Sequence, residues 1–210
     1  MRTTNISIVY IDDINDEILS QYMSKVYCST PFRCSAAITD VIKEYKEIPF
    51  CGDEGYEKLL QNATVKSANV ILIDNHLFEE RTAGVSRFSG KQFKVILRKL
   101  LPYVEVLIIT QDETLVGENV ICKFSGRHGE NATKYYQEKL APLLDSAIKE
   151  VLDFEQLAND LRQSSDVEKL LVDKILSSLQ GDDSYDELTK TDIDNLISSF
   201  KELKDACRER

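Results

Sequence analysis

The stretch Asn69–Leu77 reads Asn-Val-Ile-Leu-Ile-Asp-Asn-His-Leu. Its four consecutive apolar residues, three of them β-branched, run without a polar break and end at Asp74. A short continuous apolar run of this kind is typical of a strand buried on both faces, as in a parallel sheet. Open α/β sheets place their ligand sites at the carboxyl ends of such strands. The sequence therefore predicts that Asp74 is a carboxylate at the ligand-binding edge of a sheet.

Further apolar runs end at polar residues in the same way. The predicted strands are Ile6–Ile11, which is followed by Asp12-Asp13, Glu105–Thr110, which ends at a hydroxyl, and Val120–Cys122, which is followed by Lys123. A strand is also expected at Glu47–Cys51, because the following Gly-Asp-Glu-Gly leads into a helical pattern. The segment Cys28–Lys46 fits either a strand-like alternation or, from Ala37, a short helix.

Amphipathic segments separate the strands. The predicted helices are one opening at Asp16-Glu17 with Ile18, Leu19, Tyr22, Met23 and Val26 inward, one at Lys91–Leu101 with Phe93, Ile96, Leu97 and Leu100 inward, and one from about Asn131 past Val151. Strands that alternate with helices indicate parallel βαβ units. We therefore expect residues 1–150 to form a three-layer α/β/α sandwich on a five-stranded parallel sheet of the flavodoxin-like type.

The remainder of the chain, residues 151–210, is different in kind. Two leucine- and isoleucine-rich amphipathic helices are separated by Gly181–Ser184, which predicts a helical hairpin as a C-terminal extension. This segment carries fifteen acidic and eight basic residues, so it contributes −7 to the formal net charge of −10. Such acidity disfavours binding to DNA or to an anionic membrane surface, and no basic recognition helix is evident.

The chain shows neither an apolar stretch long enough to span a membrane nor a signal peptide, so we expect a cytoplasmic protein. Its five cysteines lack metal-type or redox-type spacing, which favours reduced thiols and disfavours a zinc site.

The carboxyl ends of parallel strands meet at one edge of the sheet. This edge would bring together the carboxylates of Asp12-Asp13 and Asp74, the hydroxyl of Thr110 and the ammonium of Lys123. Two or three carboxylates suit Mg²⁺, whose octahedral shell is completed by water. One further carboxylate oxygen is left as a nucleophile toward a phosphoryl group. The metal ion, an ammonium and a hydroxyl then neutralise the charge on the transferring oxygens.

With Asp12-Asp13 after Val-Tyr-Ile, Asp74 after Ile-Leu-Ile, Thr110 after Leu-Ile-Ile, and Lys123, residues 5 to 150 resemble the receiver domain of two-component response regulators. The resemblance implies that Asp74 accepts a phosphoryl group from a histidine kinase or a phosphotransfer protein. It implies a Mg²⁺ site made by Asp12, Asp13, Asp74 and the backbone carbonyl of His76. Thr110 would bind a phosphoryl oxygen, and Lys123 would pair with the phosphate.

The chain departs from the family pattern at several positions. Twelve residues separate Thr110 from Lys123, too few for the family's fourth helix, and an insertion is expected within Cys28–Lys46. The loop after Asp74 is long. Gln111 replaces a small residue, Phe124 replaces a proline, and Val120 offers no aromatic ring for the usual switch. The pocket resembles the family more closely than the output surface does.

Three functions follow from this pattern. The first is a phosphorylated signalling protein, a phosphoacceptor rather than a turnover enzyme, that acts on a protein effector through residues 151–210 or pairs with a second copy as a homodimer. The second is a pseudo-receiver, a scaffold that is not phosphorylated. The third is a Mg²⁺-dependent phosphohydrolase, which needs a general acid or base that only Asn75 and His76 stand near enough to supply.

Overall fold

A computed structural model of the protein describes residues 2–32, 39–50, 56–77, 89–126 and 131–163, together with residues 172, 173 and 177. Apart from residues 172, 173 and 177, the predicted C-terminal hairpin lies outside these residues, as does most of the loop after Asp74. The chain divides into two compact units, Met1–Leu152 and Asp153–Arg210, and the sheet belongs to the first. None of the described helices is long and apolar enough to cross a membrane.

Five parallel strands form one sheet in the order β2-β1-β3-β4-β5. Their bounds are β1 Arg2–Asp12, β2 Thr39–Pro49, β3 Val70–Asp74, β4 Glu105–Thr110 and β5 Val120–Cys122. This order is that of flavodoxin-like doubly wound sheets and of receiver domains. The predicted fold class is therefore confirmed, and the fold is receiver-like.

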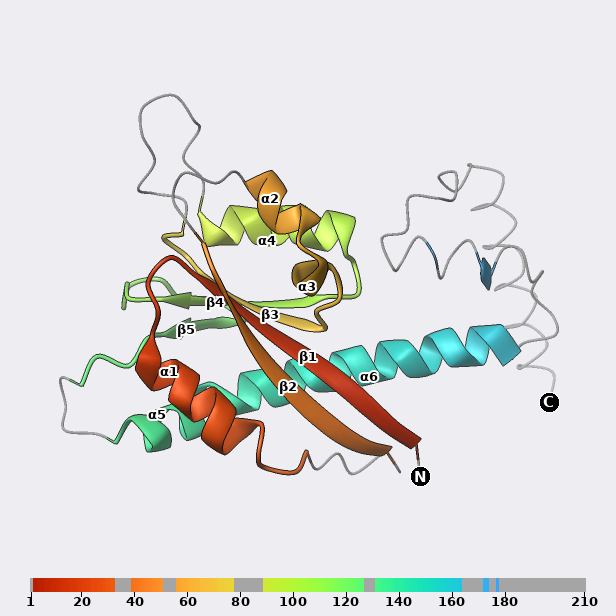
Figure 1. The fold of residues 1–210 in the computed structure, drawn as a ribbon, viewed down its shortest axis with the longest axis horizontal. Coiled ribbons are helices and arrows are strands. Elements are labelled where there is room, and N and C mark those ends of the chain that lie inside the picture. Colours follow the sequence, from red (N-terminus) through yellow and green to blue (C-terminus); the bar gives the residue numbers. More distant parts are fainter. Residues whose placement is uncertain are drawn as a thin grey trace. The chain divides into compact units, whose positions relative to one another are not determined.

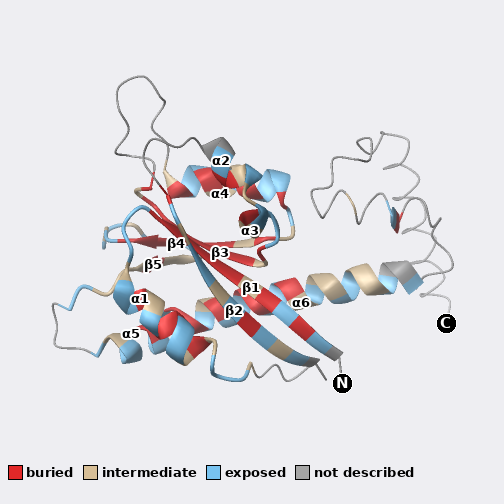
Figure 2. Cartoon of the chain, in the orientation of Figure 1, coloured by how far each residue is buried: buried red, intermediate tan, exposed pale blue. Residues whose placement is uncertain are grey.

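Helices cover both faces of the sheet (Figure 1). One face carries α1 (Glu17–Tyr22), the π-helical turn η1 (Met23–Tyr27), α5 (Ala132–Lys139) and, up to Leu152, α6 (Ala141–Gln163). The other carries α2 (Tyr56–Gln61), α3 (Ala63–Lys66) and α4 (Gly90–Leu100). Every residue of β3 is buried because the strand has a helical layer on each side, and Figure 2 shows burial concentrated in the central strands.

The long strand β2 corrects one prediction. It begins at Thr39, well before the expected start at Glu47, and the alternative of a helix over Ala37–Lys46 is wrong. Along β2, exposed polar residues such as Glu44 and Lys46 alternate with the more buried Lys43 and Tyr45. This mixed composition hides the strand from a search for continuous apolar runs.

Strands β1 and β2 pair along all of their length, from Arg2 opposite Thr39 to Asp12 opposite Pro49. By contrast, β1 pairs with β3 only over Ile8–Ile11. The first half of β1 therefore forms, with β2, a two-stranded parallel ribbon that extends beyond the central strands (Figure 1).

The predicted helices need smaller corrections. The helix expected from Asn131 past Val151 is two helices, α5 and α6, because Pro142 has no N–H to donate to residue 138 and its ring crowds that turn. Ile18 and Leu100, expected to point inward, are 48% and 45% exposed. Leu19, Tyr22 and Met23 are buried as predicted.

Candidate functional site

The carboxyl ends of four strands bring the candidate residues to one edge of the sheet. β1 ends at Asp12, its neighbour β3 ends at Asp74, and β4 ends at Thr110. The N–H of Lys123, which follows β5, donates to the carbonyl oxygen of Thr110 over 2.7 Å and ties β5 to β4 at this edge. The four side chains thus start from adjacent positions, as the spacing predicts.

Lys123 bridges the two buried carboxylates. Its Nζ lies 2.6 Å from Asp12 Oδ2 and 3.0 Å from Asp74 Oδ1, and Asp12 and Asp74 are only 5% and 4% exposed. Burial works against the charged form of Lys123. The hydrogen bond to Asp12 and the charges of both carboxylates outweigh it and raise the pKa of Lys123. The ammonium therefore stays protonated between the two carboxylates.

A side chain that sequence reasoning missed, Tyr10, joins this network. Its hydroxyl donates to Asp12 Oδ2, the oxygen that also accepts from Lys123. Burial, together with the hydrogen bond and the charge of Asp12, raises the pKa of Tyr10, so the phenol remains a donor. Tyr10 passes for an ordinary apolar strand residue in the sequence. Only its place two residues before Asp12, on the same strand face, signals the contact.

The remaining predicted metal ligands lie at the rim. Asp13 is exposed, and partial burial, a hydrogen bond with Asp12 and the charges of Asp12 and Asp74 raise the pKa of its carboxyl. The backbone N–H of His76 donates to Asp74 Oδ2 over 2.6 Å. This bond folds the chain after β3 back onto the carboxylate, so His76 lies next to Asp74.

At the end of β4, Thr110 is fully buried and its Oγ1 accepts from the backbone N–H of Asp112 over 3.1 Å. In this arrangement its hydroxyl caps the turn that follows the strand. Gln111 next to it is exposed. Hydrogen bonds from Thr114 lower the pKa of Asp112 in this turn. Residues 111–119 contain no helix, as the spacing predicts.

The start of α4 closes tightly on the end of β3. Gly90 N–H donates to the carbonyl oxygen of Asn75 over 2.9 Å, and a Cβ at Gly90 would lie 2.5 Å from the carbonyl oxygen of Asp74. Only glycine allows this approach of backbone to backbone. Asn75 is itself buried, and its Oδ1 has no hydrogen-bond partner among the described residues.

Two tyrosines of α5 hold the backbone on both sides of Lys123. The Tyr135 hydroxyl donates to the carbonyl oxygen of Cys122 over 3.0 Å, and the N–H of Phe124 donates to the Tyr136 hydroxyl over 3.1 Å. The Tyr136 ring in turn packs against Tyr22 of α1, with ring centroids 5.4 Å apart. The lysine segment is thereby linked to helices on one face of the sheet.

A cleft of about 540 Å³ opens above Lys123 between the β1–α1 loop and the residues that follow β4 and β5. Its lining includes three carboxylates, on Asp16, Glu17 and Glu113. It also includes Ile14, Ile18 and Phe124, of which Ile14 and Ile18 are 70% and 48% exposed. The approach to the site thus combines negative charge with exposed apolar surface.

Whether the site suits Mg²⁺ depends on its donors. Among the described residues, no group of three or more His, Cys, Asp or Glu side chains is arranged to hold a metal ion. Each oxygen of Asp12 and Asp74 already accepts from a protein donor. However, Asp12, Asp13 and Asp74 outnumber the one ammonium of Lys123, and carboxylates are the ligands that Mg²⁺ prefers. The donors fit the ion in chemistry, and binding requires it to displace protein donors.

No known family model matches the sequence, and no curated protein matches it. Solved structures of two RcsB response regulators are similar to the chain. One, from Salmonella typhimurium and described by its conformational dynamism for DNA interaction, is 11% identical with a TM-score of 0.38, covering 92% of this chain and 100% of that one. The other, an RcsB–DNA complex, is 14% identical with a TM-score of 0.37, covering 93% and 99%. Values this low carry no argument of their own, so the receiver-like fold of this chain rests on its strand order.

Proposed function

We propose that the protein is a receiver-type signalling protein in which Asp74 accepts a phosphoryl group with the help of Mg²⁺. The observation that carries the proposal is the bridge from Lys123 Nζ to Asp74 Oδ1 and Asp12 Oδ2, at 3.0 and 2.6 Å. A buried carboxylate paired with an ammonium, beside a second carboxylate and on a strand next to the one that ends at Thr110, is the arrangement that phosphoryl transfer to aspartate needs.

In the transfer, an Asp74 carboxylate oxygen attacks phosphorus while the bond from phosphorus to a histidine nitrogen of the donor breaks. The electron pair of that bond leaves with the donor's imidazole. Lys123 already contacts Asp74 and can follow the negative charge onto the phosphoryl oxygens. Asp12, Asp13, Asp74 and the His76 carbonyl would hold Mg²⁺, which neutralises part of that charge when bound.

The cleft above Lys123 supports a protein donor. Asp16, Glu17 and Glu113 repel small anionic phosphodonors, whereas a basic surface around a phosphohistidine is attracted. The exposed Ile14 and Ile18 add apolar contact area at the same rim. We therefore propose a histidine kinase or phosphotransfer protein as donor. We also propose that the output runs through protein contacts of residues 151–210 rather than DNA, since the formal net charge is −10.

The test is an amide NMR spectrum with Mg²⁺ before and after beryllofluoride, a mimic of the phosphoryl group. We expect shifts near Asp13, Asp74, Thr110 and Lys123 in the wild type and none in Asp74→Asn. The control Asp40→Asn removes an equal charge from the exposed surface of β2, near its start, and should respond as the wild type does. If the spectrum of the wild type changes with neither Mg²⁺ nor beryllofluoride, the proposal is wrong.

The pseudo-receiver is a second candidate, favoured by the protein donors that already occupy each oxygen of Asp12 and Asp74 and by the bulk of Gln111 at the cleft. It predicts shifts with Mg²⁺ but none with beryllofluoride. Sustained release of phosphate from small organic phosphates would instead favour the phosphohydrolase.

A further inference from the structure

Both carboxylate oxygens of Asp12 are held by protein donors. Oδ2 accepts from Lys123 Nζ and from the Tyr10 hydroxyl, and Oδ1 accepts from the backbone N–H of Ile14 over 3.3 Å. Of these three donors, only Tyr10 belongs to a strand, since Ile14 lies in the β1–α1 loop and Lys123 follows β5. Its ring is 2% exposed and belongs to the core shared with α1 and α6. The Tyr10 hydroxyl therefore has a fixed position from which to orient the carboxylate.

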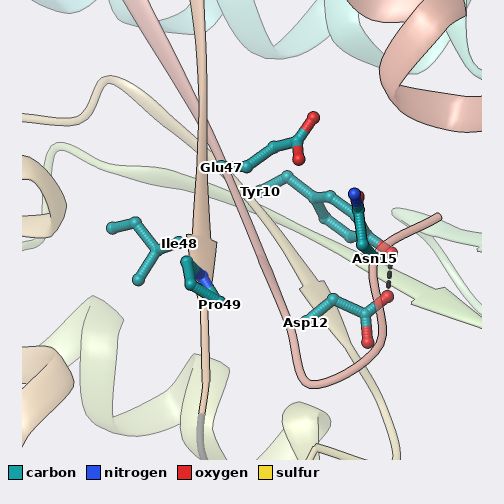
Figure 3. A pocket seen from close by; sticks show the side chains of 6 residues that line it. All are labelled: Tyr10, Asp12, Asn15, Glu47, Ile48 and Pro49. Carbon is teal, nitrogen blue, oxygen red and sulfur yellow. Dashed lines mark hydrogen bonds between the residues drawn. The ribbon is translucent and has the colours of Figure 1, made fainter. Parts of the chain in front are cut away.

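A small pocket of about 170 Å³ lies beside this contact, on the side of β2 (Figure 3). Tyr10, Asp12 and Asn15 line it together with Glu47, Ile48 and Pro49. In Figure 3 the Tyr10 hydroxyl and the Asp12 carboxylate point toward each other, joined by their hydrogen bond. The pocket leaves free space next to the Asp12 carboxylate. Tight packing alone therefore does not keep the carboxylate in its orientation.

We propose that Tyr10 is a positioning residue that holds Asp12 Oδ2 on Lys123 and thereby opposes the turn of Asp12 toward a bound cation. The inference about the cation rests on the proposed function, because the cation is the Mg²⁺ of the phosphoacceptor site. The inference about Lys123 does not. Tyr10 donates to the same oxygen as the lysine, so its hydroxyl stabilises the state in which Lys123 bridges Asp12 and Asp74.

The test variant is Tyr10→Phe, which keeps the buried ring and removes only the donor. We expect Mg²⁺ to bind Tyr10→Phe about three- to tenfold more tightly than the wild type, because the cation no longer has to displace the hydrogen bond from Tyr10 to a charged oxygen. The gain is limited because water replaces part of that hydrogen bond in the variant. The dissociation constant is measured by titrating amide shifts with Mg²⁺. The matched control is Tyr45→Phe on β2, whose hydroxyl lies 3.4 Å from Ser20 Oγ, and its affinity should equal that of the wild type.

A second measurement requires no metal. Hydrogen exchange of the Lys123 ammonium, followed by heteronuclear NMR, should be several-fold faster in Tyr10→Phe than in the wild type and in Tyr45→Phe. A folded Tyr10→Phe with unchanged Lys123 exchange overturns the inference whatever the cation does. Unchanged or weaker Mg²⁺ binding, in a protein whose wild type binds Mg²⁺, overturns it as well.

These outcomes are separable from the proposed function. A wild type that fails to bind Mg²⁺ removes the phosphoacceptor proposal, and the role of Tyr10 is then decided by Lys123 exchange alone. If the wild type binds Mg²⁺ and responds to beryllofluoride while Tyr10→Phe is unchanged in both measurements, the proposed function stands and the role of Tyr10 is wrong.

Discussion

Lys123 is the cation that two buried carboxylates share. Leaving a carboxylate buried without a partner costs several kcal/mol, and Asp12 and Asp74 are each at most 5% exposed. Without the ammonium, two like charges would remain close together at adjacent strand ends. The same residue that is proposed to follow the phosphoryl group is therefore expected to stabilise the resting fold. We expect Lys123→Met to lower the free energy of unfolding at neutral pH by about 3 kcal/mol.

The pH dependence has a definite sign. The pKa of Lys123 is raised in the fold, so its stabilisation is complete below the unfolded-state pKa of about 10.4 and is lost as the pH rises through the higher folded-state pKa. Urea unfolding of the wild type and of Lys123→Met measures their difference in the free energy of unfolding, and this difference should shrink above about pH 10.4. The control Lys134→Met loses an exposed ion pair with Glu138 at 3.8 Å and should change stability by less than about 1 kcal/mol. Equal losses in the two variants would contradict the argument.

At the scale of elements, the junction of β3 and α4 is fixed by a close backbone contact at Gly90. A Cβ there would lie 2.5 Å from the carbonyl oxygen of Asp74, so Gly90→Ala forces the helix start away from the strand end. We expect a loss of about 1–3 kcal/mol in the free energy of unfolding, measured by denaturant. In Gly117→Ala the new Cβ meets Val120 at 3.4 Å, an ordinary contact, and the change should stay within about 0.5 kcal/mol.

The elements that the sequence predicts well are those whose burial leaves a simple pattern. β4 has the predicted bounds, and β3 ends at Asp74 as expected, because both are covered on each side and so read as apolar runs. The start of β2 could not be predicted from the sequence, because exposed charged residues such as Glu44 and Lys46 interrupt its apolar residues. The strand ends that carry the candidate site follow from the same patterns. The Tyr10 contact does not, because it depends on where one hydroxyl points within the core.

At the scale of the whole first unit, the site is connected to α5 through hydrogen bonds on both sides of Lys123. Tyr135 and Tyr136 bind the carbonyl oxygen of Cys122 and the N–H of Phe124, so a shift of the lysine segment pulls on the helix. If Asp74 is phosphorylated as proposed, beryllofluoride should shift amides of α5 in the wild type. In the double variant Tyr135→Phe, Tyr136→Phe, the shifts around Asp74 should remain and those in α5 should fall sharply.

The control for this experiment is Tyr103→Phe, which removes a hydroxyl bonded to the carbonyl oxygen of Lys66 on the opposite face of the sheet. It should leave the α5 response intact. An α5 response that persists in the double variant would show that the signal leaves the site by another route.

In the ribbon formed by β1 and β2, some backbone amides of β1 are protected from hydrogen exchange with solvent and others are not. Ser7 directs its N–H and C=O toward Asn69, on the β3 side, and alternation along the strand turns Thr3 and Asn5 the same way. β3 pairs only from Ile8 onward, so among the described strands these two amides have no partner, whereas Thr4 and Ile6 face β2. Deuterium uptake should therefore alternate from one residue to the next along the first half of a single strand.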